Sequence, residues 1–257
     1  MIGRIDLNAD MGEGFGPWQM GADAALLDIV TSANIACGMH AGDWDTMART
    51  MAVAAQRGVG IGAHPGFPDI QGFGRRRMDL PLPSVANLVR YQLGAAQAMA
   101  KAAGAQVRHL KLHGALANMA SLDEALAHAC YEGALSVDPE VIIMVIAGTA
   151  QERAARRLGC RAACEIFADR AYAEDATLLD RRLPGAVLHD PAAICDRVLA
   201  MLEAEAILTA EGSRIPARID TICLHGDTPE AVDIARTLRA GLERAGVALQ
   251  RFDGGVL

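Results

Sequence analysis

The chain has 257 residues, of which 52% are hydrophobic and 21% charged, and its formal net charge at pH 7 is −7. These values exclude a disordered, collagen-like or coiled-coil protein and predict one domain, residues 1–257, with a large buried core. The negative charge, without a long run of lysines and arginines, argues against nucleic-acid binding. The longest apolar stretch, 141–147, is too short for a membrane span, and we expect a cytoplasmic protein without membrane contact.

Short β-type runs alternate along the chain with longer Ala- and Leu-rich segments of helical spacing. This alternation is typical of parallel strands joined by crossover helices. We expect strands at residues 2–7, 32–36, 59–63, 107–112, 141–147, 162–167, 220–224 and 247–252. We expect helices at residues 23–30, 45–57, 84–103, 122–135, 149–158, 191–211 and 229–245, with Ser84, Asp190 and Thr228 as caps beside prolines.

Eight strands with about seven helices fit a (β/α) barrel better than an open doubly wound sheet, because no G-x-G-x-x-G fingerprint follows the first strand. No G-x-x-x-x-G-K-[ST] loop is present either, so the chain lacks the usual P-loop for ATP. The segment 169–191 is rich in turn formers and charges, and we expect it to be a long loop over one end of the barrel.

The six cysteines form no C-x-x-C pair, which indicates reduced thiols rather than a disulfide framework or a structural zinc site. Cys37 and Cys223 each precede a histidine by two or three residues, so either could be a nucleophile. A small buried hydrophobic residue is the favoured interpretation of both.

Reactive side chains gather at the C-terminal ends of the predicted strands, where the active sites of barrel enzymes form. These residues are Asp6, Asn8, Asp10, Asn34, His40, His64, Lys111, His113, Glu165, Asp169 and His225.

The fourth strand alternates polar and apolar residues, which places His109, Lys111 and His113 on one face, toward the barrel lumen. Nearby histidines and burial should lower the pKa of Lys111 toward values useful for acid–base chemistry. His109 lies deeper in the strand and is expected to be a core histidine.

The segment from Asp6 to Asp10 copies the start of a calcium-binding loop, but Met11 and Pro17 stand where glycine and glutamate are required. Its polar groups could bind a metal, orient a water or cap the loop. No H-E-x-x-H helix is present, so any metal site would use histidines from different strands. A serine-hydrolase G-x-S-x-G motif is also absent.

A glycine-containing loop carries three consecutive arginines, Arg75, Arg76 and Arg77. Guanidinium groups suit a carboxylate or a phosphate through bidentate pairing. All three cannot point inward, and we favour Arg75 for this role because it directly follows the glycines.

Seven ordered motifs closely resemble the LamB/YcsF family over nearly the whole chain. The motifs are I-D-L-N-A-D-M-G-E-G (5–14), S-A-N-I-A-C-G-M-H-A-G-D (32–43), I-G-A-H-P-G-F-P-D (61–69), F-G-R (73–75), K-L-H-G-A-L-A-N (111–118), E-I-F-A-D-R-A-Y (165–172) and C-L-H-G-D (223–227).

This resemblance implies a distorted (β/α) barrel of seven to eight parallel strands, similar to glycoside hydrolases and deacetylases. It also implies ATP-dependent opening of the lactam 5-oxo-L-proline to L-glutamate, together with 5-oxoprolinase subunits B and C, which fits the missing P-loop. Leu112 and Ala117 depart from the proline and tyrosine usual in the family, and we expect them to alter substrate fit.

With the resemblance, the residues divide into two sets of candidates. The expected catalytic residues are Asp10, His64, Lys111, His113, Glu165 and His225. The expected substrate-binding residues are Asn8, Glu13, Asn34, His40, Arg75 and Asp169. Two alternatives stay open: a deacetylase-like amide hydrolase that uses a divalent metal and no ATP, and a non-catalytic subunit that binds substrate for its partners. The number of copies in the assembly also stays open.

Overall fold

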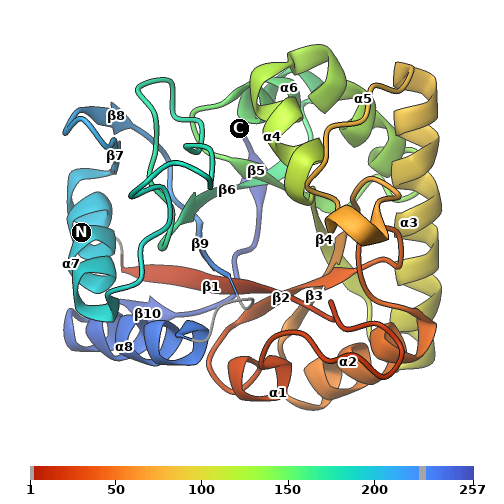
Figure 1. Ribbon diagram of the computed structural model, residues 1–257, viewed down its shortest axis with the longest axis horizontal. Helices are drawn as coiled ribbons and strands as arrows, with labels where there is room; N and C mark the ends of the chain where they lie inside the picture. The colour runs from red at the N-terminus through yellow and green to blue at the C-terminus, as the bar shows by residue number, and fades with distance from the viewer. Residues whose placement is uncertain (1–2, 226–229) are drawn as a thin grey trace.

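The computed structural model describes residues 3–225 and 230–257. Within these ranges, seven parallel strands close into a barrel, because β9 pairs with both β6 and β1 (Figure 1). The barrel strands are β1 (Arg4–Met11), β2 (Ser32–Ala36), β3 (Gly60–His64), β4 (Val107–Lys111), β5 (Ile142–Ile146), β6 (Arg161–Phe167) and β9 (Thr221–Leu224). The expected (β/α) barrel is therefore confirmed, with seven strands rather than eight.

Helices surround the strands on the outside of the barrel (Figure 1). They are α1 (Asp23–Leu26), α2 (Trp44–Gln56), α3 (Leu82–Ala102), α4 (Gly114–Leu122), α5 (Glu124–Leu135), α6 (Ala150–Leu158), α7 (Pro191–Ala204) and α8 (Ala231–Arg244), with a 3-10 turn at Ile70–Gly72. No helix in the described part of the chain is long and apolar enough to cross a membrane.

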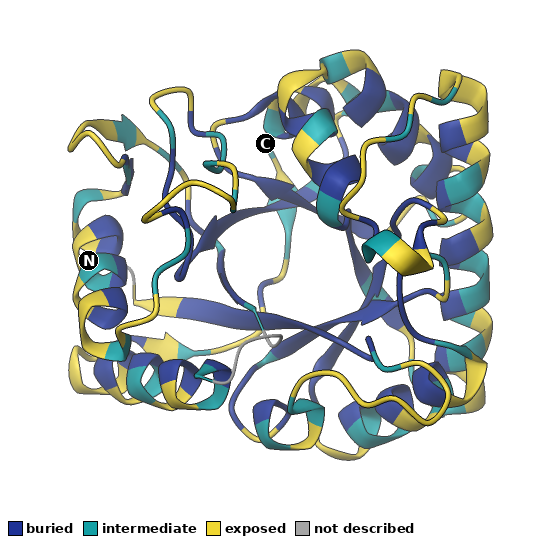
Figure 2. Cartoon of the chain, in the orientation of Figure 1, coloured by how far each residue is buried: buried dark blue, intermediate teal, exposed yellow. Residues whose placement is uncertain are grey.

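The barrel strands are buried along nearly their whole length, whereas the helices expose their outer faces (Figure 2). On β1, Leu7 and Ala9 belong to the main hydrophobic core, while the polar residues Asp6, Asn8 and Asp10 alternate with them. Because side chains alternate between the two faces of a strand, the polar set shares one face. Their partners on β4, β6 and β9 place this face in the lumen.

The lumen is filled so tightly that one strand position requires glycine. A Cβ atom on Gly62 of β3 would lie only 2.1 Å from Nε2 of His109 on β4. At the other end of the lumen, Phe252 packs with Ile142 and Met144, and its ring contacts His109 edge-on at 5.2 Å. Among the described residues, the barrel is thus a packed core, and its cavity lies at the C-terminal ends of the strands.

The expected eighth strand, 247–252, is wrong as a barrel strand. Only β10 (Ala248–Leu249) forms there, and it pairs with the start of β1 beside the closed ring. A second short strand, β11 (Gly255–Val256), runs antiparallel to β6. Because β9 already pairs with both β1 and β6, the C-terminal segment cannot enter the barrel. It pairs instead with the ends of β1 and β6 that extend beyond β9.

The expected helix 191–211 ends early, at Ala204. Glu205 adopts a left-handed conformation with φ of 46°, and the chain then forms a hairpin of β7 (Ala206–Leu208) and β8 (Arg214–Pro216). Strand pairing therefore overrides the helical propensity of this Ala- and Glu-rich segment. The start of this helix is as expected, with the Asp190 side chain accepting a hydrogen bond from the amide of Ala192.

Three further helix predictions differ from the structure. Ser84 is not a cap: α3 begins one turn earlier, after Pro81, and Pro83 occupies its first turn, where no amide partner is needed. Helix α4 was not expected, because no helix was predicted between residues 112 and 122. The expected helix 23–30 is reduced to the single turn of α1. The predicted cap Thr228 lies outside the described residues.

Candidate functional site

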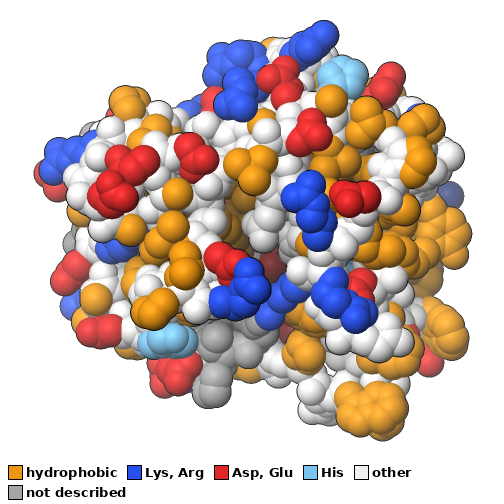
Figure 3. Space-filling view, turned by 45° about the horizontal axis from the view of Figure 1, so that its top comes forward, with side chains coloured by type: hydrophobic (Ala, Val, Ile, Leu, Met, Phe, Trp, Pro, Cys, Tyr) orange, Lys and Arg blue, Asp and Glu red, His pale blue; other side chains and the backbone are white. Residues whose placement is uncertain are grey.

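A cavity of about 670 Å³ opens at the C-terminal ends of the barrel strands. Figure 3 shows a hollow in this face with Lys and Arg side chains gathered around it. Eight of the twelve predicted site residues line the cavity: Asp10, Glu13, His64, Arg75, Lys111, His113, Glu165 and His225. The other four, Asn8, Asn34, His40 and Asp169, are buried behind its wall.

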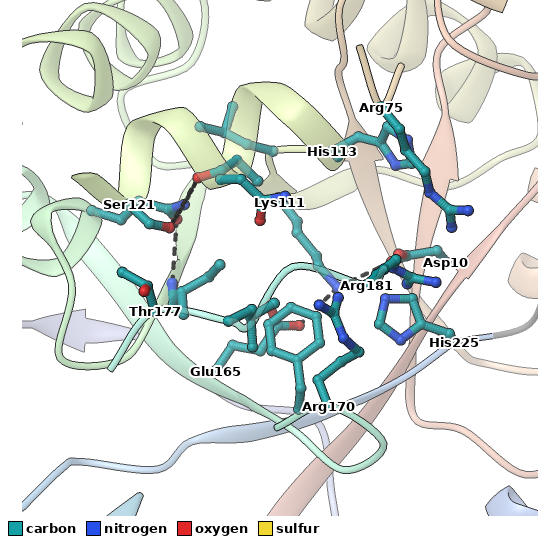
Figure 4. Close-up of a pocket in the computed structure, with 18 of the residues that line it drawn as sticks. Asp10, Arg75, Lys111, His113, Ser121, Glu165, Arg170, Thr177, Arg181 and His225 are labelled. Carbon is teal, nitrogen blue, oxygen red and sulfur yellow. Dashed lines mark hydrogen bonds and ion pairs between the residues drawn. The ribbon is translucent and has the colours of Figure 1, made fainter. Parts of the chain in front are cut away.

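Lys111 holds a positive charge at the floor of the cavity (Figure 4). Its Nζ lies 2.9 Å from Glu165 Oε1, 3.1 Å from Asp10 Oδ1 and 2.9 Å from Cys223 Sγ. Burial lowers the pKa of Lys111, but the carboxylates outweigh it and the pKa is raised well above its ordinary value. The expectation of a lowered pKa is therefore wrong: the ammonium form is favoured, because β1 and β6 bring the carboxylates of Asp10 and Glu165 across the lumen.

The two carboxylates beside Lys111 differ in their proton affinity. Burial raises the pKa of Asp10, but His64 and Lys111 outweigh it and leave the pKa well below the ordinary value. Burial raises the pKa of Glu165, and Lys111 offsets this only in part. Asp10 is thus a fixed anion, whereas Glu165 is the better proton acceptor of the two.

Buried amides hold these carboxylates in place. The Asn8 side-chain nitrogen donates to Glu165 Oε1 and to the Thr221 hydroxyl, at 3.0 and 2.8 Å. The Asn34 nitrogen donates to Asn8 Oδ1 and Asp10 Oδ1, and Asn34 Oδ1 accepts from His109 Nε2 at 2.7 Å. Asn8 and Asn34 therefore position the site from below, and His109 is the core histidine that the sequence predicted.

Asp6 belongs to the barrel interior rather than to the cavity. Its carboxylate accepts hydrogen bonds from the hydroxyls of Thr31, Ser32 and Thr221 at 2.5 to 2.7 Å. Burial raises its pKa to about 6. With both oxygens bonded to hydroxyls, Asp6 does not share a metal site with Asp10.

Three imidazoles cluster on one side of the cavity. His64 Nε2 lies 3.0 Å from His113 Nδ1, and the ring of His40 stacks on that of His113 at 3.6 Å. Burial, together with His64, lowers the pKa of His113 to about 3. Gly74, with φ of 61°, passes so close that a Cβ there would lie 2.6 Å from His40 Cβ and 2.8 Å from His113 Cδ2.

His225, which also lines the cavity, is paired with Asp169. Its Nδ1 lies 2.8 Å from an Asp169 carboxylate oxygen, and its ring stacks on Phe167 with centroids 5.5 Å apart. A carboxylate at this distance accepts the Nδ1 proton and leaves Nε2 as the proton-accepting nitrogen. Asp169 therefore fixes the tautomer of His225. The motif residues 226 and 227 lie outside the described residues.

The three consecutive arginines have different positions. Arg75 lines the cavity, and its guanidinium lies 4.8 Å from the centre of the Phe73 ring. Arg76 instead pairs with the buried carboxylate of Asp69. Arg77 reaches the cavity with a side chain that is 70% exposed.

Sequence reasoning missed a second group of cations. Arg170, Arg181 and Arg182 line the cavity from the long loop between β6 and α7. Figure 4 shows Arg170 and Arg181 near Lys111 and His225. Arg170 is held by the carbonyls of Ala186 and Leu179. The only signal was the charge of segment 169–191, which indicated a loop but not which side chains turn inward.

The six cysteines are all buried and unbridged. Burial raises the pKa of Cys37 to about 12 and that of Cys223 well above its usual value. Thiols in this state are weak nucleophiles, which agrees with the interpretation of both as small buried side chains.

Residues 5–255 match the model of the LamB/YcsF family. A protein of Ruegeria pomeroyi that is named as the A subunit of 5-oxoprolinase is 65% identical over 97% of this chain and 99% of its own length. The crystal structure of a lactam utilization protein from Thermus thermophilus has a TM-score of 0.91 and 39% identity, covering 97% of this chain and 100% of that one. The catalytic domain of a peptidoglycan N-acetylglucosamine deacetylase from Eubacterium rectale has a TM-score of 0.52 at 11% identity, over 97% and 88%, which confirms the deacetylase-like fold alone.

Proposed function

Because the chain belongs to the LamB/YcsF family, we propose that it is the A subunit of a 5-oxoprolinase that opens the lactam ring of 5-oxo-L-proline to L-glutamate. The reaction uses ATP and takes place together with 5-oxoprolinase subunits B and C. The observation that carries the proposal is the ammonium of Lys111, fixed by Asp10 and Glu165 at the floor of a cavity lined with arginines.

A lactam carbonyl is a poor electrophile, so the reaction needs a group that stabilises negative charge on its oxygen. Lys111 is suited to this role because its pKa is raised and it stays charged throughout. The same charge serves if ATP first phosphorylates the amide oxygen. Asp10, with its pKa well below the ordinary range, keeps Lys111 in place and does not take up a proton.

The arginines are the candidates for binding the acidic groups of the substrate. Arg75 and Arg170 line the cavity together with Arg181, and guanidinium groups pair with carboxylates and phosphates through two parallel hydrogen bonds. Asn8 is a weaker candidate, because its amide nitrogen is already bonded to Glu165 and Thr221.

Hydrolysis also requires proton transfer. The oxygen of water adds to the lactam carbonyl carbon, the carbon–nitrogen bond breaks, and the nitrogen takes a proton. We assign this transfer to His225, whose Nε2 is left as the acceptor by the bond from Nδ1 to Asp169, and to Glu165, whose pKa is raised. His225 takes this role in place of His113, because burial and the nearby His64 lower the pKa of His113 to about 3 and make its ring a weak base.

The direct test measures glutamate and phosphate released from 5-oxo-L-proline and ATP, with the chain alone and with subunits B and C added. We expect release only with the partners present, and loss of release with Lys111→Ala. Full activity of that variant in the assembled complex would overturn the role of Lys111. No release by the complete wild-type assembly would overturn the substrate.

A further inference from the structure

Two histidines on the cavity wall face each other through one ring nitrogen each. His64 Nδ1 lies 2.8 Å from the carbonyl oxygen of Lys111, and His113 Nε2 lies 2.8 Å from the carbonyl oxygen of Phe73. A carbonyl oxygen only accepts, so both of these nitrogens must donate. When both rings are neutral, the remaining nitrogens, His64 Nε2 and His113 Nδ1, each carry a lone pair and no proton. These two nitrogens lie 3.0 Å apart. Two lone pairs at this distance require a cation between or beside them.

A carboxylate oxygen lies near each of the two facing nitrogens. Asp10 Oδ2 lies 3.3 Å from His64 Nε2, and Glu13 Oε1 lies 4.0 Å from His113 Nδ1. All four side chains are buried or nearly so, with at most 10% of any of them exposed. Donor atoms of Glu13, His64 and His113 therefore lie within 4.8 Å of one another, and an Asp10 oxygen lies beside His64 Nε2.

His40 supplies an independent observation. It is fully buried, and among the described residues neither of its ring nitrogens has a hydrogen-bond partner. One donor atom of His40 lies within 4.8 Å of donor atoms of Glu13, His64 and His113. Its Nε2 lies 3.9 Å from Glu13 Oε1, beyond hydrogen-bond distance. A buried polar group without a hydrogen bond is costly, so we expect a further polar ligand beside His40.

We propose that His64 Nε2 and His113 Nδ1, with the carboxylates of Asp10 and Glu13, bind one divalent transition-metal ion such as Zn²⁺. Imidazole nitrogens with carboxylate oxygens are typical ligands of zinc and its neighbours, whereas magnesium and calcium prefer oxygen alone. The hydrogen bonds from the outer ring nitrogens to the carbonyls of Lys111 and Phe73 are those that orient metal-binding histidines in general.

His40 is not assigned as a ligand. Its ring is parallel to that of His113, with an interplanar angle of 6°, and two parallel rings cannot both direct an in-plane nitrogen at one ion. His40 is instead placed to hold a water or a substrate atom bound to the ion. The alternative to a metal ion is a single proton shared by His64 and His113. Such a proton would satisfy the two lone pairs, but it would not supply a water to the unbonded nitrogens of His40.

The ion would lie in the cavity that Lys111 also lines, because Asp10, His64 and His113 are part of the same wall. Binding of the ion does not depend on the proposed lactam-opening activity. It can be measured on the chain alone, without substrate, ATP or partner subunits, so failure of one proposal leaves the other standing.

The test begins with the full chain after removal of bound metal by a chelator. Titration with ZnCl2, followed by calorimetry, should show one ion per chain with a Kd of about 1 μM or tighter. CoCl2 should produce a visible absorption band of a nitrogen- and oxygen-ligated ion. The variants His64→Ala and His113→Ala should each weaken binding about 100-fold or more, whereas His189→Ala, an exposed histidine, should bind as the wild type does.

Circular dichroism shows whether each variant keeps its fold. If neither variant folds, the wild type decides, because zinc should shift the imidazole nitrogen resonances of His64 and His113. Absence of saturable binding to the wild type overturns the proposal. Binding that survives in folded His64→Ala and His113→Ala places the ion elsewhere and overturns it equally. A proton that His64 and His113 still share after ZnCl2 is added, seen in the nitrogen resonances of their rings, would also overturn the proposal.

Discussion

Lys111 on β4 and Glu165 on β6 form a 2.9 Å ion pair across the barrel, although β5 separates their strands. Both side chains are almost completely buried, with 6% of Lys111 and 1% of Glu165 exposed. A charge in such a place is tolerated only when its partner and its hydrogen bonds are complete. The pair therefore couples the stability of the barrel to the chemistry of the cavity floor.

Replacement of Lys111 by methionine should impair both stability and activity. The variant leaves the carboxylates of Glu165 and Asp10 without their cation, and we expect the free energy of unfolding to fall by about 3–5 kcal/mol. The double variant Lys111→Met/Glu165→Gln should regain part of this stability, because one buried anion is removed, but no activity. Denaturant unfolding and glutamate release measure the two effects, with the exposed Lys101→Met as control. An active double variant would show that the ammonium is structural only.

Much of the site could be predicted from the alternation of residues on β4, which places Lys111 and His109 on one face. The pKa of Lys111 could not, because its direction depends on which carboxylates the closed barrel brings across the lumen. The periodicity of a strand predicts which of its faces is polar, but it does not predict which side chains of other strands lie across the lumen. Arg170 was missed for a related reason: its inward direction is set by carbonyls of its own loop.

The elements themselves show where local patterns are sufficient. The barrel strands have continuous apolar or alternating patterns and were all found, with shifts of a few residues at their ends. The hairpin of β7 and β8 was missed, since Ala206–Leu208 continues a helical composition and becomes a strand only by pairing with Arg214–Pro216. Pairing between distant residues, unlike periodicity, is not visible in a single sequence.

Arg75 and Arg77 offer a matched test of the substrate's acidic groups. Arg75→Ala should raise KM for 5-oxo-L-proline about 10- to 100-fold with little change in kcat, since a charged hydrogen bond contributes about 1.5–3 kcal/mol. Arg77→Ala should change KM less than about twofold, because this side chain is 70% exposed and lies near Asp79. Arg75→Lys should not restore binding, since lysine lacks the planar fork. Equal effects of the two alanine variants would contradict the assignment.

Ala117 and Leu112, which the resemblance suggests depart from the family's usual residues, both line the cavity. Ala117→Tyr should narrow the cavity and increase the preference for a five-membered over a six-membered lactam acid by about tenfold or more, the discrimination that one methylene typically allows. The measurement is the ratio of kcat/KM values for the two rings in the complete assembly. Ala98→Tyr, on the exposed face of α3, is the control. An unchanged ratio would show that Ala117 does not contact the ring.

Asp6 makes the stability of the barrel depend on pH. Burial raises its pKa to about 6, against an ordinary value of 3.8, despite hydrogen bonds from Thr221, Thr31 and Ser32 that lower it. The folded state therefore binds the proton more tightly than the unfolded state does. The resulting stabilisation is complete below about pH 4 and is lost as the pH rises through about 6; its size is roughly 3 kcal/mol.

Asp6→Asn removes this titration and keeps the size of the side chain. The difference between the free energies of unfolding of the wild type and the variant should therefore decrease between about pH 4 and pH 7. The altered hydrogen bonds add a constant to this difference and do not change its dependence on pH. Urea unfolding at intervals across this range measures the difference. The exposed Asp233→Asn should show no such decrease. A difference that stays constant or increases with pH would mean that Asp6 is ionised in the folded barrel, with its three hydroxyl donors outweighing burial.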